Sequence, residues 1–229
     1  MNNKNPVMKI QNISFKKHLS KLIYKNITLE LQQGEMLFLK MDTAKDVSNF
    51  GDLTSMLIPP LDGRIFFDGK DLNTLPSSLK EESRYYIKRV FEGKGFISNL
   101  TIAKNIMLSE LHHTKRKEKD IQEEIIKLSQ IFDITDIFNL RPFRCSKLHL
   151  KLAQWIRALS GTSKLIILED PFTRDNMKNQ LLFDILNEKV KTGISVIWLL
   201  HSMYKYKILE AENIEIIDFN QNFRDLGNQ

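Results

Sequence analysis

The alternation of apolar and polar positions predicts strands toward both ends of the chain. Residues 25–31 alternate strictly, as a strand with one buried face does. Residues 165–168 and 194–200 are nearly continuous apolar runs, which are typical of strands buried on both faces of a parallel sheet. The predicted strands cover residues 8–15, 25–31, 36–41, 64–68, 165–168, 194–200 and 213–219.

Apolar residues between these strands recur at three- and four-residue spacing, which predicts amphipathic helices. The predicted helices cover residues 47–57, 102–111, 118–132, 148–159 and 180–191. Pro59 and Pro60 end the first of them. An antiparallel start, a helical middle and an alternating strand–helix end indicate an α/β fold. We expect one domain over residues 1–229, with a helical subdomain inserted at about residues 92–144.

Composition places the chain among ordinary globular proteins. It has 229 residues, of which 42 % are hydrophobic and 27 % charged. No apolar run reaches the roughly 18 residues that a membrane-spanning helix needs, and the N-terminus lacks the apolar stretch of a signal peptide. The single cysteine, Cys145, allows no intramolecular disulfide, which favours a reducing compartment. We therefore expect a cytoplasmic protein.

A formal net charge of +6 indicates attraction to an anionic partner, such as a membrane leaflet, a nucleic acid or an acidic protein. The alternative is that the lysine content reflects genome composition and carries no function. The basic run at residues 112–119 contains Glu118, leads into a predicted helix and has no interleaved aromatic residues. This pattern favours a solvated helix entrance over a nucleic-acid patch, which would supply aromatic rings for base stacking.

Five segments, in order, resemble landmarks of the ABC-type ATPase domain. They keep that family's spacing over nearly the whole chain. The segments are QGE at 33–35, DGRIFFDGKDL at 62–72, VFEGKGFISNLTIAKNI at 90–106, IRALSGTSKLIILEDPF at 156–172 and IWLLHS at 197–202. They are similar, in turn, to the turn before the phosphate-loop strand, the stretch after the first helix, and the glutamine-loop, Walker B and histidine-loop segments.

The resemblance implies an ABC transporter ATP-binding subunit. Its fold would be a P-loop NTPase-like α/β core with N-terminal antiparallel strands and a helical subdomain. The run FEGKGFISNLTIAKN and the PF after the Walker B segment are most similar to ATPases that serve phospholipid-trafficking, MCE-type transporters. Lipoprotein-release and cell-division ABC subunits carry similar segments.

The phosphate loop of this family has the form G-x-x-G-x-G-K-[ST], and here it reads MDTAKDVS from Met41. Non-glycine residues occupy all three glycine positions, and Val47 stands in the lysine position. Lysine–phosphate bonds are charge-assisted, so losing the lysine and the amide nest costs about 3–6 kcal/mol of binding. Lys45 is an alternative phosphate contact, and Asp46 reads as a helix cap. The nucleotide-binding positions that the resemblance implies are Lys45, Val47, Ser48, Asn49 and Glu92.

At the other motifs that the resemblance locates, most of the family's functional residues are also replaced. Glu92 replaces the glutamine of the glutamine loop, and the aromatic residue that stacks on adenine would fall near Lys17. His201 matches the histidine-loop position, although a structural histidine is the simpler interpretation. The signature LSGGQ corresponds to Cys145, Ser146, Lys147, Leu148 and His149, and the catalytic positions are Glu169, Asp170 and His201.

These replacements predict a pseudo-ATPase with little or no ATP hydrolysis. No cofactor is expected; MgATP, if it binds, would use Ser48 and Glu169 for the metal. The implied partners are a membrane permease and a second ABC ATPase subunit, identical or different, at the inner face of the cytoplasmic membrane. The expected docking residues for the permease are Phe91, Glu92, Phe96 and Ile97. Two alternatives stay open: an active subunit with divergent motifs, and a basic soluble scaffold that binds nucleic acid.

Overall fold

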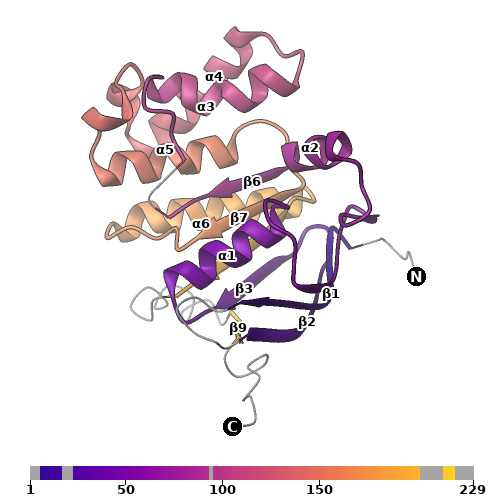
Figure 1. Cartoon of the computed structure of the whole chain (residues 1–229). Coiled ribbons are helices and arrows are strands. Elements are labelled where there is room, and N and C mark those ends of the chain that lie inside the picture. Colours follow the sequence, from indigo (N-terminus) through magenta and orange to yellow (C-terminus); the bar gives the residue numbers. More distant parts are fainter. Residues whose placement is uncertain (1–5, 17–22, 93–94, 202–213, 220–229) are drawn as a thin grey trace.

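A computed structural model describes residues 6–16, 23–92, 95–201 and 214–219. Figure 1 shows two β-sheets with helices packed around them, and a layer of helices at the far end from the two termini. The predicted α/β fold with antiparallel N-terminal strands is confirmed. No helix of the described residues combines the length and the apolar character needed to cross a bilayer.

The first sheet is antiparallel and has the strand order β2-β1-β4-β5. Its strands are β1 (Met8–Lys16), β2 (Ile23–Leu31), β4 (Asp62–Phe67) and the short β5 (Lys70–Asp71). Register shifts interrupt the pairing of β1 with β2 near Asn12, whose φ is 48°. The shifts keep Ile10 and Ile13 on the buried face, so the sheet covers one side of the core.

The second sheet is parallel, in the order β6-β7-β8-β3-β9. Its strands are β3 (Met36–Lys40), β6 (Ile87–Val90), β7 (Leu165–Glu169), β8 (Ser195–Leu200) and β9 (Ile216–Asp218). Every residue of β7 and β8 is buried, as the continuous apolar runs predict. All the described pairings are parallel, so the carboxyl ends of these strands share one edge.

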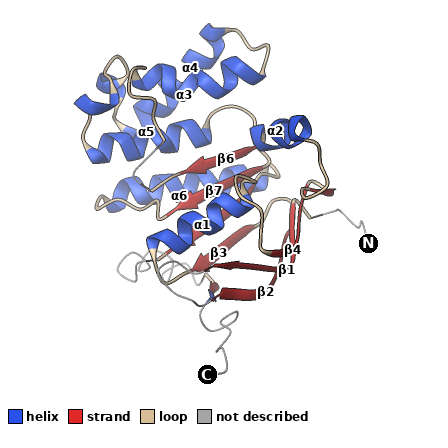
Figure 2. Ribbon diagram, in the orientation of Figure 1, coloured by secondary structure: helices blue, strands red, loops and turns tan. Residues whose placement is uncertain are grey.

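Helices cover both faces of the parallel sheet (Figure 2). They are α1 (Ala44–Thr54), α2 (Ser77–Tyr85), α3 (Ile102–His113), α4 (Glu118–Phe132), α5 (Lys147–Leu159) and α6 (Asn176–Lys191), with 3-10 turns at Thr135–Ile137 and Pro142–Arg144. The α1 helix packs on β7 and β8, and α5 packs on β6 and against both α3 and α4. The α3 and α4 helices lie within the predicted insertion at 92–144, whose boundaries stay a prediction.

Two apolar clusters hold these layers together. One lies between the parallel sheet and α3 to α6, and the other lies between the same sheet, α1 and the antiparallel sheet. Trp198 lies in the first cluster, and its ring stacks against Phe38 and Phe172 at centroid distances of 5.4 and 5.3 Å. The parallel sheet is therefore packed on both faces, and this packing supports the strand ends from which the loops at its carboxyl edge begin.

The structure corrects several predicted boundaries. The first helix begins at Ala44 and ends at Thr54, whereas residues 47–57 were expected, because Thr43 caps the helix and Met56 adopts a left-handed φ of 61°. The helix expected over 180–191 begins earlier, at Asn176. The α2 helix and the β6 strand are among the elements that were not predicted, because both carry charged residues at positions where apolar residues would have revealed them.

Candidate functional site

The loops that follow the parallel strands meet at the carboxyl edge of the sheet. In open α/β sheets this edge is where ligands bind. The phosphate-loop segment follows β3, and its Met41 backbone N–H donates to the carbonyl of Leu200 at 2.8 Å. Glu92, Asp170 and His201 follow β6, β7 and β8. The structure therefore gathers the predicted site positions from four parts of the chain.

The phosphate-loop segment forms a capped helix start. The Thr43 hydroxyl accepts a hydrogen bond from the Asp46 backbone N–H at 3.1 Å and donates to the Asp46 carboxylate at 2.8 Å. Thr43 is therefore the cap, and the interpretation of Asp46 as the cap was wrong. The Val47 side chain is fully buried in the core, whereas Lys45 is exposed and Ser48 and Asn49 are half-buried. Val47, which stands in the lysine position of the family pattern, thus contributes to the packing of the core.

Thr43→Ala is expected to lower the free energy of unfolding by about 1 kcal/mol, because the helix N-terminus loses its side-chain cap. Urea unfolding followed by circular dichroism measures this change. Thr43→Ser, which keeps the hydroxyl, is the control and should cost less than half as much. Equal losses in the two variants would contradict the capping role.

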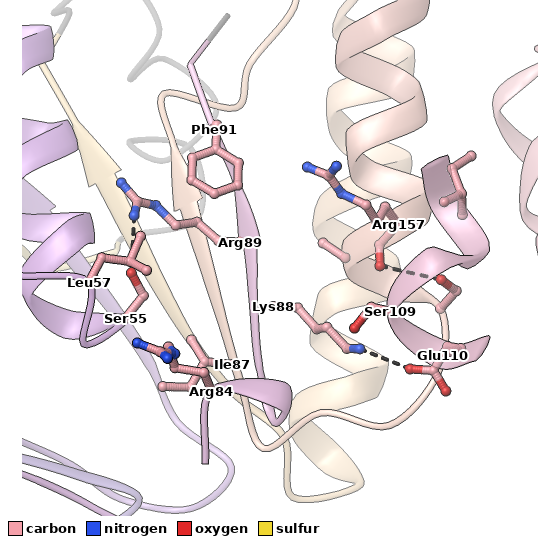
Figure 3. A pocket seen from close by; sticks show the side chains of 13 residues that line it. Ser55, Leu57, Arg84, Ile87, Lys88, Arg89, Phe91, Ser109, Glu110 and Arg157 are labelled. Carbon is pink, nitrogen blue, oxygen red and sulfur yellow. Dashed lines mark hydrogen bonds and ion pairs between the residues drawn. The ribbon is translucent and has the colours of Figure 1, made fainter. Parts of the chain in front are cut away.

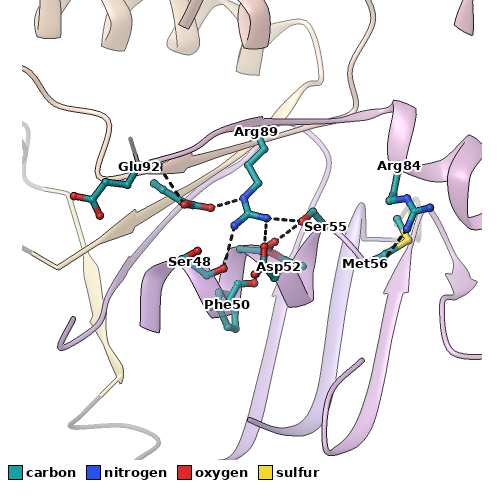
Figure 4. Close-up of polar contacts among 11 residues, drawn as sticks. Ser48, Phe50, Asp52, Ser55, Met56, Arg84, Arg89 and Glu92 are labelled. Atoms are coloured by element: carbon teal, nitrogen blue, oxygen red, sulfur yellow. Dashed lines mark hydrogen bonds and ion pairs between the residues drawn. The ribbon is translucent and has the colours of Figure 1, made fainter. Parts of the chain in front are cut away.

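Arg89 lies at the centre of a buried ionic network beneath this loop (Figure 4). Its Nε donates to the carboxylate of Glu169, and its Nη1 contacts the Asp52 carboxylate at 2.6 Å and the Ser55 hydroxyl at 3.0 Å. Its Nη2 donates to the Ser48 carbonyl at 3.0 Å. The Arg89 side chain is 4 % exposed and that of Glu169 is 2 % exposed. The guanidinium therefore joins β6, α1 and β7 away from bulk water.

Within this network, the Glu169 carboxyl has a pKa that is shifted from its usual range. Burial raises its pKa to about 7, and the Arg89 guanidinium opposes this rise. Its second oxygen faces the backbone N–H of Glu92 at 3.4 Å. Sequence reasoning missed Arg89, because no strand was predicted at β6 and the contact with Glu169 depends on the pairing of β6 with β7.

Three predicted positions come together beside this network. The ligand atoms of Glu92, Asp170 and His201 lie within 4.8 Å of one another, an arrangement that could hold a metal ion. The Nδ1 of His201 is 3.0 Å from the Asp170 carboxylate. Asp170 is buried, has a φ of 41° and is tied by its backbone N–H to the Leu199 carbonyl at 2.8 Å. The fold therefore holds this carboxylate–histidine pair in a fixed orientation.

A cavity of about 210 Å³ lies beside β6, and Ser55 and Arg89 of the ionic network are among the residues that line it (Figure 3). Phe91 lines it, and the Arg157 guanidinium lies 6.0 Å from the Phe91 ring and 5.0 Å from the Phe96 ring. Burial lowers the pKa of Arg157 to about 10. Ile97 is 46 % exposed and does not line this cavity. The structure thus places Phe91 at a basic cavity and Phe96 near the Arg157 guanidinium that also lines it, and the role of both residues in docking stays a prediction.

Comparisons with known proteins point to one family of ATP-binding domains. No protein-family profile matches the chain. The chain is 25 % identical over 195 residues to the ribose import ATP-binding protein RbsA of Clostridium tetani, covering 82 % of this chain and 38 % of that protein. It is 25 % identical over 205 residues to the macrolide export ATP-binding/permease protein MacB of Vibrio parahaemolyticus, covering 85 % and 31 %. The chain thus spans about a third of the length of these two relatives.

Shorter relatives and solved structures agree. The chain is 24 % identical over 208 residues to an uncharacterised ABC transporter ATP-binding protein of Methanocaldococcus jannaschii, covering 85 % and 89 %. A dimeric bacterial ABC transporter cassette matches with a TM-score of 0.78 at 17 % identity, covering 93 % of this chain and 94 % of that one. A post-hydrolysis cassette dimer bound to ADP and phosphate matches with a TM-score of 0.75, also at 17 % identity, covering 86 % and 89 %. The chain has the ABC ATPase cassette fold.

The signature segment of this cassette caps a helix. The Ser146 hydroxyl accepts a hydrogen bond from the backbone N–H of His149 at 3.1 Å, at the start of α5. Lys147 and Leu148 follow it in the first turn, and both are exposed. The structure therefore presents two long side chains at the positions that hold glycines in the family pattern.

The described residues do not fit a magnesium-bound triphosphate, the group that the cassette fold implies. Val47 is buried where a phosphate-binding lysine would stand, and the Asp46 carboxylate lies in the same loop. The Glu169 carboxylate already contacts Arg89 and faces the Glu92 backbone N–H. The adenine-stacking position near Lys17 lies outside the described residues.

Proposed function

We propose that this chain is a pseudo-ATPase subunit of a membrane transport complex, with a structural or regulatory role in place of ATP hydrolysis. One observation carries the proposal: the side chain in the phosphate-lysine position, Val47, is fully buried in the core. A lysine there bonds the β- and γ-phosphates in P-loop proteins. Replacing it by a core valine removes a charge-assisted contact and leaves no side chain at that position able to replace it.

The same loop adds an unfavourable charge. Asp46 is buried, and Thr43 donates to its carboxylate. A triphosphate in this loop would face that negative charge without the lysine that normally offsets phosphate charge. Together these features support a loss of affinity of about 10² to 10⁴ relative to an intact loop.

The cassette fold also supports a proposal about partners. ABC ATP-binding proteins, among them the relatives named above, serve transport, and the solved neighbours include dimers. We infer a docking platform for a membrane permease at the inner face of the cytoplasmic membrane, paired with a second cassette that is identical or different. The segment 90–106 supports phospholipids as the transported class. Residues 92–144 would form the inserted helical subdomain of a single domain, 1–229.

An active ATPase with divergent motifs is the second candidate. The Asp170–His201 contact at 3.0 Å favours it, because a carboxylate and a histidine at these positions resemble the general-base arrangement that ATP hydrolysis needs. Asp170 is one methylene shorter than glutamate, which leaves its carboxylate farther from an attacking water.

Calorimetric titration with MgATP distinguishes the two candidates. We expect no binding with a Kd below about 1 mM, because the buried valine and Asp46 remove about 3–6 kcal/mol of phosphate binding. A cassette that retains the phosphate-loop lysine, measured in the same buffer, is the positive control. Micromolar binding that Ser48→Ala or Asp170→Asn abolishes would contradict the pseudo-ATPase proposal.

The transport role has a separate test. Co-expression with a permease encoded beside this chain should yield a complex in detergent. Ile97→Asp should weaken it, because a charge at this half-exposed apolar side chain opposes apolar contact. Leu181→Asp on α6, which is 38 % exposed, is the matched control. A chain that stays alone in the presence of every neighbouring permease would contradict the docking role.

A further inference from the structure

Arg89 is the cation that lies between two carboxylates from different segments of the chain. Two carboxylates, from Asp52 on α1 and Glu169 at the end of β7, converge on its guanidinium. The Glu169 side chain is 2 % exposed and that of Asp52 is 27 % exposed. Buried carboxylates that lack a counter-ion are strongly unfavourable. The Arg89 guanidinium therefore offsets carboxylate charge at this point.

The packing around Arg89 leaves room for its guanidinium at Gly51. Gly51 lies in the interior of α1, where glycine costs about 1 kcal/mol of helix stability relative to alanine. A Cβ at Gly51 would lie 2.7 Å from the Arg89 Nη2 and closer still to the Glu169 carboxylate. The helix thus gives up intrinsic stability at a residue where a side chain would collide with the ion pair.

The network also reaches the loop that follows β6. The Phe91 ring lies 4.5 Å from the guanidinium carbon of Arg89, and the Glu92 backbone N–H faces Glu169. The guanidinium further binds the carbonyl of Ser48, the residue in the metal-binding position of the phosphate loop. One side chain therefore ties together the helix after the phosphate loop, the Walker B strand end and the glutamine-loop segment.

We propose that Arg89 is a built-in replacement for a divalent cation, which contacts both the Glu169 and the Asp52 carboxylates and holds these three segments together without nucleotide. The guanidinium offers several donors in a fixed planar geometry, so the arrangement needs no metal and no ligand. The segment at Phe91 and Glu92 is then held in one orientation at all nucleotide concentrations. This inference concerns the apo chain and does not depend on the proposed transport role.

Thermal unfolding of the full chain at pH 8 tests the inference. Arg89→Met should lower the Tm by about 10 °C in NaCl, because two carboxylates lose their counter-ion. At equal ionic strength, about 10 mM MgCl₂ should restore about 4 °C of that loss. The wild type and Arg84→Ala, a control on α2 whose guanidinium contacts the Met56 carbonyl, should respond to Mg²⁺ by less than about 1 °C.

A second variant identifies the site of the Mg²⁺ effect. Arg89→Met combined with Glu169→Gln removes the buried carboxylate, so its Mg²⁺ response should vanish while its Tm recovers toward that of the wild type. An Arg89→Met variant that ignores Mg²⁺, or that stays unfolded in both salts, overturns the inference. MgATP binding by the wild type would overturn the proposed function alone, so the two proposals fail separately.

Discussion

Glu110→Gln is expected to lower the free energy of unfolding by about 3–5 kcal/mol, which corresponds to a Tm decrease of roughly 10 °C. The Glu110 side chain is 2 % exposed and that of Lys88 is 8 % exposed, with 2.9 Å between the carboxylate and the ammonium. Neutralising one partner leaves the other charged and out of water. Differential scanning calorimetry measures the change directly.

The position of Glu110 explains the size of this effect. It is at the end of α3, and it accepts hydrogen bonds from Lys88 on β6 and from the hydroxyl of Tyr85 on α2. Arg116, in the connection to α4, lies 3.5 Å from the same carboxylate. The residue therefore links the helical layer to the edge of the parallel sheet, beside the cavity in Figure 3. Its loss should loosen this junction as well as lower the overall stability.

Glu123→Gln on α4 is the matched control. Glu123 forms an exposed pair with Lys119 at 3.8 Å, and such pairs contribute less than about 0.5 kcal/mol. A combined Glu110→Gln and Lys88→Met variant should recover part of the stability, because no charge is then buried without a partner. If Glu110→Gln and Glu123→Gln cost the same, the buried pair does not hold the junction.

The strands and helices that could be predicted from the sequence are those whose burial follows a simple period. The expected helix over 118–132 matches α4 in full, and β7 extends the expected run by one residue. The β6 strand has the sequence IKRV, and all four residues are buried. Two of them are cations that are buried only because carboxylates from distant segments neutralise them. Hydrophobic patterning could not reveal a strand of this kind.

Part of the candidate site could also be predicted from the sequence, where residue identity alone carries the information. The absence of the phosphate-loop lysine is visible at Val47 in the sequence alone. The role of Asp46 was misjudged, because the choice between Thr43 and Asp46 as cap depends on side-chain geometry. The partner of Glu169 could not be found, since Arg89 lies 80 residues earlier and meets it only through the β6–β7 pairing.

Raising the pH from about 4.5 to about 7 is expected to lower the stability contributed by Glu169 by about 3 kcal/mol. Burial raises the pKa of this carboxyl from 4.5 to about 7, against the attraction of Arg89. A group whose pKa is higher in the folded state binds its proton more tightly there. Its contribution is therefore complete below pH 4.5 and is lost as the pH rises through about 7.

The difference in stability between the wild type and Glu169→Gln isolates this contribution, because glutamine does not titrate. Urea unfolding at several pH values between 4.5 and 8 should show the wild type losing stability relative to the variant. Titrating groups outside this network change both proteins equally and cancel. A single guanidinium faces two carboxylates here, Asp52 and Glu169, so uptake of one proton near neutral pH balances the network. Parallel pH profiles would instead mean that Arg89 keeps Glu169 ionised throughout.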